Sequence, residues 1–486
     1  MIYDLLIVGG GINGAAIARE AALNGWSVLL VERNDLASAT SSKSSGLIHG
    51  GLRYLEQRDF RLVAEALAER ERMVDAAPHL VRPMRFVIPH INAIRPWWLV
   101  RIGLFIYDWI GGKKTLKRSR SISKKDYLYI KPLKKISRGF VYSDAQVDDS
   151  RLVILNAIDA ADAGAVIVTQ CSVVSAVRDE DTWTAELSTG VSVSARVIVN
   201  AAGPWVAQML QRFGVPSSQH VRLVKGSHIV VPRLYEGDHA YLLQQPDRRI
   251  VFVLPWEGMT AVGTTDVVVD QADDVAIDDE EIRYLCNAVG SAFTRAIVPD
   301  EIVFSWTGIR PLHGSVEESA QKISRDYLLD LNCTGAPILN IFGGKITTAR
   351  CLAEDAIIRI GHALDRAVSP VTRTRPLPGG AIDDPQAYAA YVATIWPSLG
   401  RDRIHRMVRA YGSMLPELLG KSTDFGREFG AGLLEVEVRW MRDREWARTS
   451  EDVLMRRSKC GLHMTDSERS EFVEWWLDTF EKNDLE

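Results

Sequence analysis

The first residues whose types and spacing suggest a chemical role lie near the N-terminus. Three glycines, Gly9, Gly11 and Gly14, follow a short apolar run and form the pattern G-x-G-x-x-G. An alanine-rich segment comes next, and then a second apolar run that ends in Glu32. In a strand–turn–helix–strand unit, such glycines let the backbone approach a pyrophosphate, and the acid accepts a hydrogen bond from a ribose hydroxyl. The pattern therefore predicts a dinucleotide site, without separating FAD from NAD.

A second group of chemically capable residues follows directly. Residues 37–46 read ASATSSKSSG, and residues 47–56 continue as LIHGGLRYLE. Hydroxyl-rich loops of the first kind can form hydrogen bonds with phosphates and with the edges of aromatic rings. Because His49, Arg53 and Tyr54 lie close together among glycines, we expect a binding loop here rather than a flexible linker.

Together these two segments resemble the signature of the FAD-dependent glycerol-3-phosphate dehydrogenases, respiratory enzymes that pass electrons to quinone. The similarity continues in order along nearly the whole chain. Its further blocks are residues 142–144, 147–152, 197–205, 225–228, 263–266, 308–312, 342–348 and 451–457. The resemblance implies FAD as the cofactor and ubiquinone or menaquinone as the electron acceptor.

The resemblance also implies a reaction, in which the C2 hydroxyl of sn-glycerol 3-phosphate is oxidised to give dihydroxyacetone phosphate. A hydride leaves C2 for the flavin N5 while a base takes the hydroxyl proton. Arginine suits a dianionic phosphate because its planar guanidinium binds two oxygens. Arg53 and Arg310 are the candidates for this role, and the Tyr54 hydroxyl is expected to orient the substrate.

Lys345 and two histidines complete the expected catalytic group. Lys345 follows two glycines at the start of a predicted helix, where it would stabilise the negative charge of reduced flavin and contact the substrate. His228 and His49 both fit the base, since an ordinary histidine pKa of about 6.5 suits proton transfer near neutrality. We place His228 first for the proton and His49 nearer the flavin, although a single histidine is more often structural.

The residues expected to contact FAD share a position in the glycine turn, the hydroxyl-rich loop or the two later flavin segments. They are Gly9, Gly11, Ile12, Asn13, Gly14, Glu32, Thr40, Ser41, Ser42, Leu47, His49, Ala202, Gly203, Gly344, Lys345 and Thr347. No metal site is expected, because the five cysteines are scattered and form no CxxC pair.

Two departures from the family pattern accompany the resemblance. Gly46 stands where members usually carry a lysine before Leu-Ile-His, which affects one contact on the cofactor side. After Arg310-Pro311-Leu312 the chain has His313-Gly314-Ser315 instead of the usual acidic pair, which affects a loop near the substrate.

The elements that must position these residues suggest an α/β fold. We expect a Rossmann-like FAD-binding domain with an inserted antiparallel-sheet substrate domain and a C-terminal all-helical domain. The FAD-binding part is predicted at about 1–75, 140–210 and 336–375, and the substrate domain at about 76–139 and 211–335. The helical domain is predicted at 376–486, where Thr465 and Glu468 match a capping box.

Composition and charge are those of a globular enzyme. The 486 residues carry 58 Lys and Arg against 62 Asp and Glu, a net charge of −4, which argues against a surface built for nucleic acid. The scattered cysteines favour a reducing compartment, and the N-terminus lacks a basic region that would indicate a cleaved signal. We therefore expect a cytoplasmic protein, with the choice between monomer and homodimer left open.

A membrane contact is nevertheless expected, because a quinone dissolves in the bilayer. The apolar stretch 97–110 is too short to span, since a spanning helix needs about 20 apolar residues. Seven cations without an acid follow it: Lys113, Lys114, Lys117, Arg118, Arg120, Lys124 and Lys125. Tryptophan with a basic flank is typical of peripheral attachment, here to the inner face of the cytoplasmic membrane. A buried helix followed by a solvated loop explains the pattern equally well.

Other functions remain as alternatives. A related flavoprotein oxidase would act on an amino acid or a hydroxy acid and return electrons to oxygen. A non-catalytic nucleotide-sensing protein would retain the same dinucleotide fold. A tRNA-modifying flavoprotein is disfavoured, because the basic residues are local and no nucleic-acid motif accompanies them.

Overall fold

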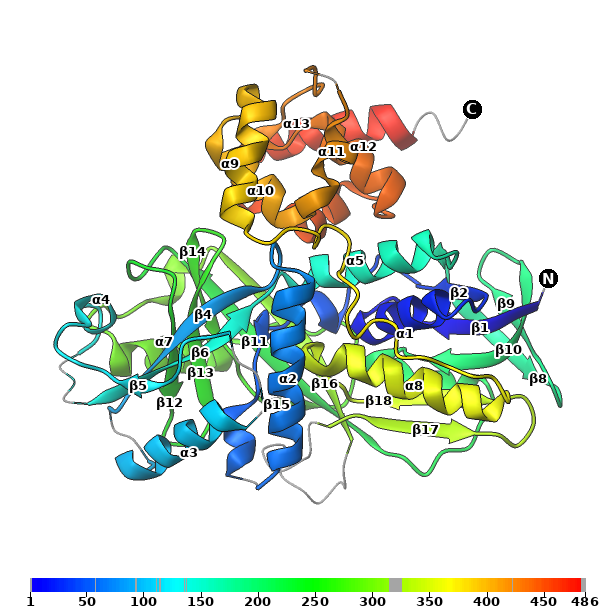
Figure 1. The fold of residues 1–486 in the computed structure, drawn as a ribbon, viewed down its shortest axis with the longest axis horizontal. Coiled ribbons are helices and arrows are strands. Elements are labelled where there is room, and N and C mark those ends of the chain that lie inside the picture. Colours follow the sequence, from blue (N-terminus) through cyan, green and yellow to red (C-terminus); the bar gives the residue numbers. More distant parts are fainter. Residues whose placement is uncertain are drawn as a thin grey trace.

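The computed structural model describes residues 2–481 apart from 57, 92, 93, 111, 113, 114, 135, 137, 314–325 and 422. Two β-sheets form the body of this part of the chain, and helices from its C-terminal region gather at one end (Figure 1). The predicted α/β fold class, with an FAD-type sheet, a second sheet and a C-terminal helical domain, is confirmed.

The first sheet has a parallel centre. Its order is β17–β18–β10–β1–β2–β7, in which β18, β10, β1, β2 and β7 are parallel neighbours, and β9 and β8 extend it from β10. The strands are β1 (Ile2–Val8), β2 (Val28–Val31), β7 (Val166–Val168), β8 (Val173–Arg178), β9 (Trp183–Leu187), β10 (Ser192–Asn200), β17 (Leu328–Asn332) and β18 (Ile338–Phe342). Central parallel strands are buried on both faces, which explains the apolar runs that predicted them.

Helices cover both faces of this sheet. On one face, α1 (Ile12–Leu23) packs beside α5 (Asp149–Asp162) and α8 (Ala349–Ala363). The alanines of α1 are buried, so these helices approach closely. On the other face, α6 (Val206–Arg212) packs with β8 and β9 in a second apolar cluster.

The second sheet is mostly antiparallel. Its order is β15–β11–β14–β13–β12–β4–β6–β3, with β16 paired to β11 and β5 paired to β6. The strands are β3 (Leu47–Ile48), β4 (Arg82–Pro89), β5 (Arg120–Ser121), β6 (Gly139–Gln146), β11 (Val221–Val231), β12 (Ala240–Gln244), β13 (Ile250–Trp256), β14 (Met259–Gly263), β15 (Val267–Val269) and β16 (Phe304–His313).

Four helices accompany the second sheet: α2 (Phe60–Ala76), α3 (Trp97–Trp109), α4 (Tyr127–Ile130) and α7 (Asp279–Ala292). Residues of α2 and α3 share one apolar cluster with the sheet, and α7 packs in another. A capping box between Asp278 and Glu281 begins α7, because the two side chains satisfy backbone N–H groups at the helix start.

The C-terminal helices follow a linker at 376–380. They are α9 (Pro385–Ile395), α10 (Arg401–Tyr411), α11 (Leu415–Leu419), α12 (Glu435–Arg444) and α13 (Asp466–Trp476), with π-helical turns at Asp452–Arg457 and Leu477–Glu481. They enclose an apolar cluster of their own. The predicted capping box of Thr465 and Glu468 is present at the start of α13.

The strand pairings cross the predicted domain boundaries in three places. β3 and β6 belong to the second sheet, although 1–75 and 140–210 were assigned to the FAD-binding domain. β17 pairs with β18 in the first sheet, although its residues were assigned to the substrate domain. β3 and its partner β6 are distant in sequence, so their place depends on pairing rather than on any local pattern, whereas β17 joins the first sheet by pairing with the next strand along the chain.

Two further findings concern the described residues only. None of their helices combines the length and apolarity needed to span a membrane. They also contain no group of three or more His, Cys, Asp or Glu side chains arranged to hold a metal ion.

Candidate active site

The glycine turn after β1 has the form that a dinucleotide requires. A Cβ atom on Gly14 would lie 1.9 Å from the Gly9 carbonyl oxygen, so only glycine lets α1 begin this close to the strand. Glu32 accepts hydrogen bonds from the backbone N–H of Gly10 at 2.6 Å and of Asn34 at 2.9 Å, and its carboxylate is held at the end of β2.

A cavity of about 190 Å³ opens at this turn. The predicted residues that line it are Gly9, Gly11, Ile12, Asn13, Glu32, Thr40, Ser41, Ala202, Gly203 and Gly344. Within it, the Ile12 N–H donates to Ser41 Oγ at 3.0 Å, and Thr40 Oγ1 donates to the Ile309 carbonyl at 2.6 Å. The hydroxyl-rich loop therefore closes over the N-terminus of α1.

A second cavity of about 280 Å³ lies next to the first, between the two sheets. The predicted residues that line it are Ile12, Thr40, Ser41, Leu47, His49, Tyr54, His228, Arg310, Gly344, Lys345 and Thr347. Ser42 lines neither cavity but a third one, described below. Arg53 belongs to the short helix Leu52–Leu55, and its side chain lies outside the described residues.

Arg310 is fixed by side chains that the sequence analysis did not single out. It lies on β16, donates to Thr264 Oγ1 at 2.8 Å and forms an ion pair with Asp266. The two partners are in the segment 263–266, which was noted only for its family resemblance. Both this segment and 308–312 match blocks of the same family, and that was the available signal that their residues act together.

Lys345 stands at the start of the helical segment as predicted. Its Nζ atom lies 4.0 Å from the centre of the Tyr54 ring, buried and without a hydrogen-bond partner in the described structure. A cation over an aromatic face is stabilised by the ring but retains its capacity to donate hydrogen bonds. Lys345 is thus ready to donate to a ligand in the second cavity.

His228 is buried on β11 against Trp306. The two rings stack at 4.7 Å, and His228 Nε2 lies 2.8 Å from Ser45 Oγ, while Nδ1 is buried and without a hydrogen-bond partner in the described structure. Burial, together with the charge of Arg310, lowers the pKa of His228 to about 3. The ring is therefore neutral at every physiological pH.

His49 is held differently. Its Nδ1 accepts a hydrogen bond from the Gly51 N–H at 3.0 Å, which places the proton of the neutral ring on Nε2. The adjacent Gly50 N–H donates to the Tyr107 hydroxyl, which donates in turn to Asp144 at 2.8 Å. Burial raises the pKa of Asp144 to about 6, and Arg70 pairs with it at 2.7 Å. This network, which sequence reasoning missed, holds the loop that carries His49.

The two departures from the family pattern have different outcomes. Gly46 has a φ of +60°, and a Cβ atom there would lie 2.7 Å from the Val147 carbonyl oxygen, so a lysine would not fit this backbone. His313 Nε2 lies 2.7 Å from Gln219 Oε1, whereas Gly314 and Ser315 lie outside the described residues.

The residues present fit FAD. Gly9 and Gly11 line the first cavity without placing a side chain in it, and the adjoining second cavity is lined by two residues that carry buried polar atoms without hydrogen bonds in the described structure, Lys345 Nζ and His228 Nδ1. A third such atom, Asn13 Oδ1, lies where the two cavities meet at Gly344. Buried polar atoms normally have partners, so this cluster indicates a bound ligand.

Comparisons with known proteins agree with this geometry. Residues 4–350 match the family model of FAD dependent oxidoreductases, and residues 370–473 match the C-terminal domain of alpha-glycerophosphate oxidase. The chain is 46% identical to D-erythritol 1-phosphate dehydrogenase of Brucella abortus, over 97% of both chains. It is 43% identical to the aerobic glycerol-3-phosphate dehydrogenase of Escherichia coli, over 98% of this chain and 97% of that protein.

A solved structure shares the fold over nearly the full length. Glycerol-3-phosphate dehydrogenase from Bacillus halodurans, complexed with FAD, superposes with a TM-score of 0.75 at 24% identity, covering 98% of this chain and 94% of that one. The chain is therefore an FAD-dependent enzyme that belongs to the glycerol-3-phosphate dehydrogenase family.

Proposed function

We propose that this enzyme oxidises the C2 hydroxyl of sn-glycerol 3-phosphate to dihydroxyacetone phosphate and passes the electrons to a membrane quinone. The observation that carries the proposal is the second cavity, which is lined by Arg310, Lys345 and His228 together. Thr264 and Asp266 hold the Arg310 guanidinium in place. A guanidinium in fixed orientation recognises a phosphate, and a neutral imidazole accepts a proton.

FAD, when bound, supplies the hydride acceptor. The glycine turn, Glu32 and the hydroxyl-rich loop would hold it. Arg310 binds the substrate phosphate, with Arg53 as a second cation from the signature segment. Lys345 and the Tyr54 hydroxyl orient the reacting end, and Lys345 offsets negative charge that develops beside it. His228 takes the C2 hydroxyl proton, and His49, with its proton on Nε2, donates a hydrogen bond on the flavin side.

A second substrate is favoured by one comparison. The relative with 46% identity is named for D-erythritol 1-phosphate, which is also a polyol phosphate but has one more carbon. The same phosphate-binding and proton-accepting groups serve either molecule. Discrimination then depends on how far the cavity extends beyond the reacting carbon, and both substrates belong in the first assay.

The first test is anaerobic reduction of the purified flavoprotein. Adding sn-glycerol 3-phosphate should bleach the flavin absorbance, whereas glycerol at the same concentration should not, because it lacks the phosphate that Arg310 binds. D-erythritol 1-phosphate is compared in a parallel cuvette, and a higher rate constant would make it the preferred substrate. Bleaching by glycine instead, with peroxide released in air, would support the amino acid oxidase alternative and contradict the proposal.

Attachment to the membrane is part of the same proposal, and α3 supports it. Of its residues only Leu104 and Tyr107 are buried, whereas Trp98, Phe105 and Trp109 are 60%, 55% and 55% exposed. The helix is thus not the buried one considered as an alternative. The exposed Arg118 lies over the Trp109 ring of this helix. Lys117, Lys124 and Lys125 are exposed as well, while Lys113 and Lys114 lie outside the described residues. Apolar side chains with a basic flank are typical of a peripheral membrane contact.

A route for the quinone leads inward from α3. A largely apolar cavity of about 580 Å³ lies beneath the helix, lined by residues such as Pro96, Leu99 and Ile106. Leu52, Leu242 and Ile250 line both this cavity and the substrate cavity. A quinone that enters from the bilayer would therefore reach the flavin side without crossing water. This supports a peripheral contact with a membrane surface, and the inner face of the cytoplasmic membrane remains the side that we propose.

The double variant Trp98→Ser/Phe105→Ser tests this contact. Each ring buried in a membrane contributes about 1.5–3 kcal/mol, so partitioning onto anionic liposomes should fall about 100-fold or more. Quinone reduction should fall with it, whereas reduction of a soluble dye should stay within about twofold. The matched control is Tyr391→Ser/Ile395→Ser, which removes exposed apolar side chains from α9, in the helical domain at the far end from α3 (Figure 1). Equal sedimentation of all three proteins would exclude α3 as the contact.

A further inference from the structure

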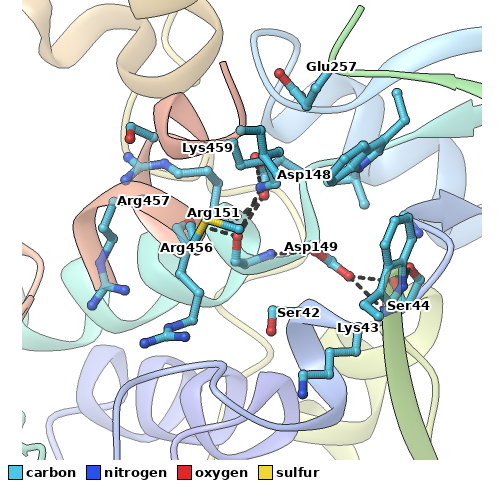
Figure 2. A pocket seen from close by; sticks show the side chains of 18 of the residues that line it. Ser42, Lys43, Ser44, Asp148, Asp149, Arg151, Glu257, Arg456, Arg457 and Lys459 are labelled. Atoms are coloured by element: carbon cyan, nitrogen blue, oxygen red, sulfur yellow. Dashed lines mark hydrogen bonds and ion pairs between the residues drawn. The ribbon is translucent and has the colours of Figure 1, made fainter. Parts of the chain in front are cut away.

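A third cavity, of about 400 Å³, lies between the C-terminal helices and the two sheets. Figure 2 shows that its walls come from the hydroxyl-rich loop (Ser42 to Ser44), the start of α5 (Asp148 to Arg151) and the C-terminal segment Arg456 to Lys459. Eight cationic residues and four acids line it. They are Lys43, Arg82, Arg151, Arg406, Arg409, Arg456, Arg457 and Lys459, with Asp148, Asp149, Glu257 and Glu451. The proposed reaction uses none of the cations.

Four of these eight cations are anchored by acids behind the cavity wall, while Lys459 pairs with Asp148 and Arg409 with Glu257 in the wall itself. Asp35 accepts from both Arg456 and Arg457 at 2.6 Å, Glu445 pairs with Arg151 at 2.5 Å, and Glu437 pairs with Arg406 at 2.7 Å. Such pairs hold guanidinium groups in fixed orientations, which reduces the entropic cost of binding an anion.

Lys43 has no such anchor. Its half-buried ammonium group has no ion pair or hydrogen bond in the described structure, and it extends in the same direction as Arg456 (Figure 2). Burial and the nearby charge of Arg456 lower the pKa of Lys43. Arg456 is compensated by Asp35 and Asp452, whereas Lys43 has only the charge of Glu451 nearby and no ion pair in the described structure. An anion bound beside Lys43 would compensate its charge in this low-dielectric space.

Buried polar atoms without partners gather here as they do in the active site. His79 Nδ1 and Nε2, Arg151 Nε and the Tyr411 hydroxyl are all buried and have no hydrogen bond in the described structure, and all three residues line this cavity. His79 is only 1% exposed. Outside the flavin and substrate site, this is a separate concentration of unsatisfied groups, and such groups indicate a ligand or ordered water.

We propose that this interdomain cavity is a second ligand site, which binds a small phosphate-bearing metabolite between Lys43 and Arg456. Its volume lies in the range of small-molecule pockets, and fixed guanidiniums with one ammonium group suit a phosphate. A lipid headgroup is disfavoured as the source, because the cavity borders the helical domain, at the far end from α3 (Figure 1).

The position of the site connects it to catalysis. Asp149 accepts hydrogen bonds from the N–H and Oγ of Ser44 at 3.1 and 2.7 Å, and the next residue, Ser45, contacts His228 at 2.8 Å. Trp306, which stacks on His228, donates to the Ser44 carbonyl at 3.2 Å. Residues 43–45 therefore form the wall between the two sites, and an anion that fixes Lys43 would also fix Ser45 on the catalytic histidine.

Calorimetric titration of the holoenzyme with inorganic pyrophosphate tests the site. Wild-type enzyme should bind at two places, the active site and this cavity, and Arg310→Ala should retain only the second. In the Arg310→Ala background, adding Lys43→Gln should weaken the remaining pyrophosphate binding at least tenfold. Adding Arg409→Gln to the same background should weaken that binding about threefold or more. The matched control is Arg401→Gln, an exposed residue of α10 outside the cavity, which should leave it within twofold.

Kinetics with a soluble dye test the connection to catalysis. At saturating sn-glycerol 3-phosphate, pyrophosphate should raise kcat in the wild type, and Arg409→Gln should need about three times more pyrophosphate for half of this rise. Equal pyrophosphate affinity with and without Lys43 would overturn the proposed site, as would a kcat at saturating substrate that pyrophosphate does not change. If phosphatidylglycerol vesicles displace pyrophosphate, the ligand is a lipid headgroup and not a free metabolite. Equal stoichiometry in wild type and Arg310→Ala would instead contradict only the role of Arg310 in the proposed function.

Discussion

Arg310→Ala should raise the Michaelis constant for sn-glycerol 3-phosphate steeply while the enzyme keeps its FAD. Removing one partner of a buried, charge-assisted contact typically costs about 2–5 kcal/mol, so kcat/KM should fall by about 30-fold to several thousand-fold. In the proposed function the glycine turn and the hydroxyl-rich loop would hold the flavin, so the absorbance spectrum of the purified variant should not change.

The geometry supplies two controls for this prediction. Arg310→Lys retains the charge but loses the two-pronged guanidinium that Thr264 and Asp266 orient, so its loss should be intermediate. Glycerol, which has no phosphate, should be turned over equally poorly by the wild type and Arg310→Ala. If KM for sn-glycerol 3-phosphate stays at the wild-type value, another group binds the phosphate, and Arg53 becomes the candidate.

His228→Asn should lower kcat by about 10²–10⁴-fold, the usual contribution of a positioned general base. Bound FAD and KM should change little, because in the proposed function the ring accepts a proton and does not hold the phosphate. His239→Asn is the matched control. It also removes a buried histidine, at the residue just before β12, but His239 hydrogen-bonds Tyr241 and does not line the substrate cavity. That variant should retain kcat.

The pH dependence follows from the causes of the His228 shift. With a pKa of about 3 in the free enzyme, the ring is deprotonated and competent over the whole range from pH 5 to 9, so kcat/KM should show no ionisation of His228 there. A phosphate dianion on Arg310 offsets the cation that helps to lower this pKa. The acidic limb of kcat should therefore lie at a higher pH than that of kcat/KM. An acidic limb near pH 6.5 in kcat/KM, lost in His49→Asn, would move the base to His49.

The local parts of the fold were predictable from the chain alone. The run before Gly9, the spacing of the three glycines and the acid at Glu32 identify β1, α1 and β2, because each feature depends on residues close in sequence. The capping box of Thr465 and Glu468 was predictable for the same reason. Family resemblance brought Arg310, Lys345 and His228 into one list, and the structure places all three around one cavity.

Other features depend on contacts between residues far apart in the chain. Neither the bracing of Arg310 by Asp266 nor the position of Lys345 over Tyr54 follows from any local pattern. The same holds for the exposed face of α3, since the same apolar sequence pattern is expected of a buried helix and of a helix that contacts a bilayer. The amino-acid sequence alone determined the dinucleotide unit and the chemical types available to the site. Only the tertiary structure decided which of those side chains meet, because burial, pKa and pairing are properties of the packed neighbourhood.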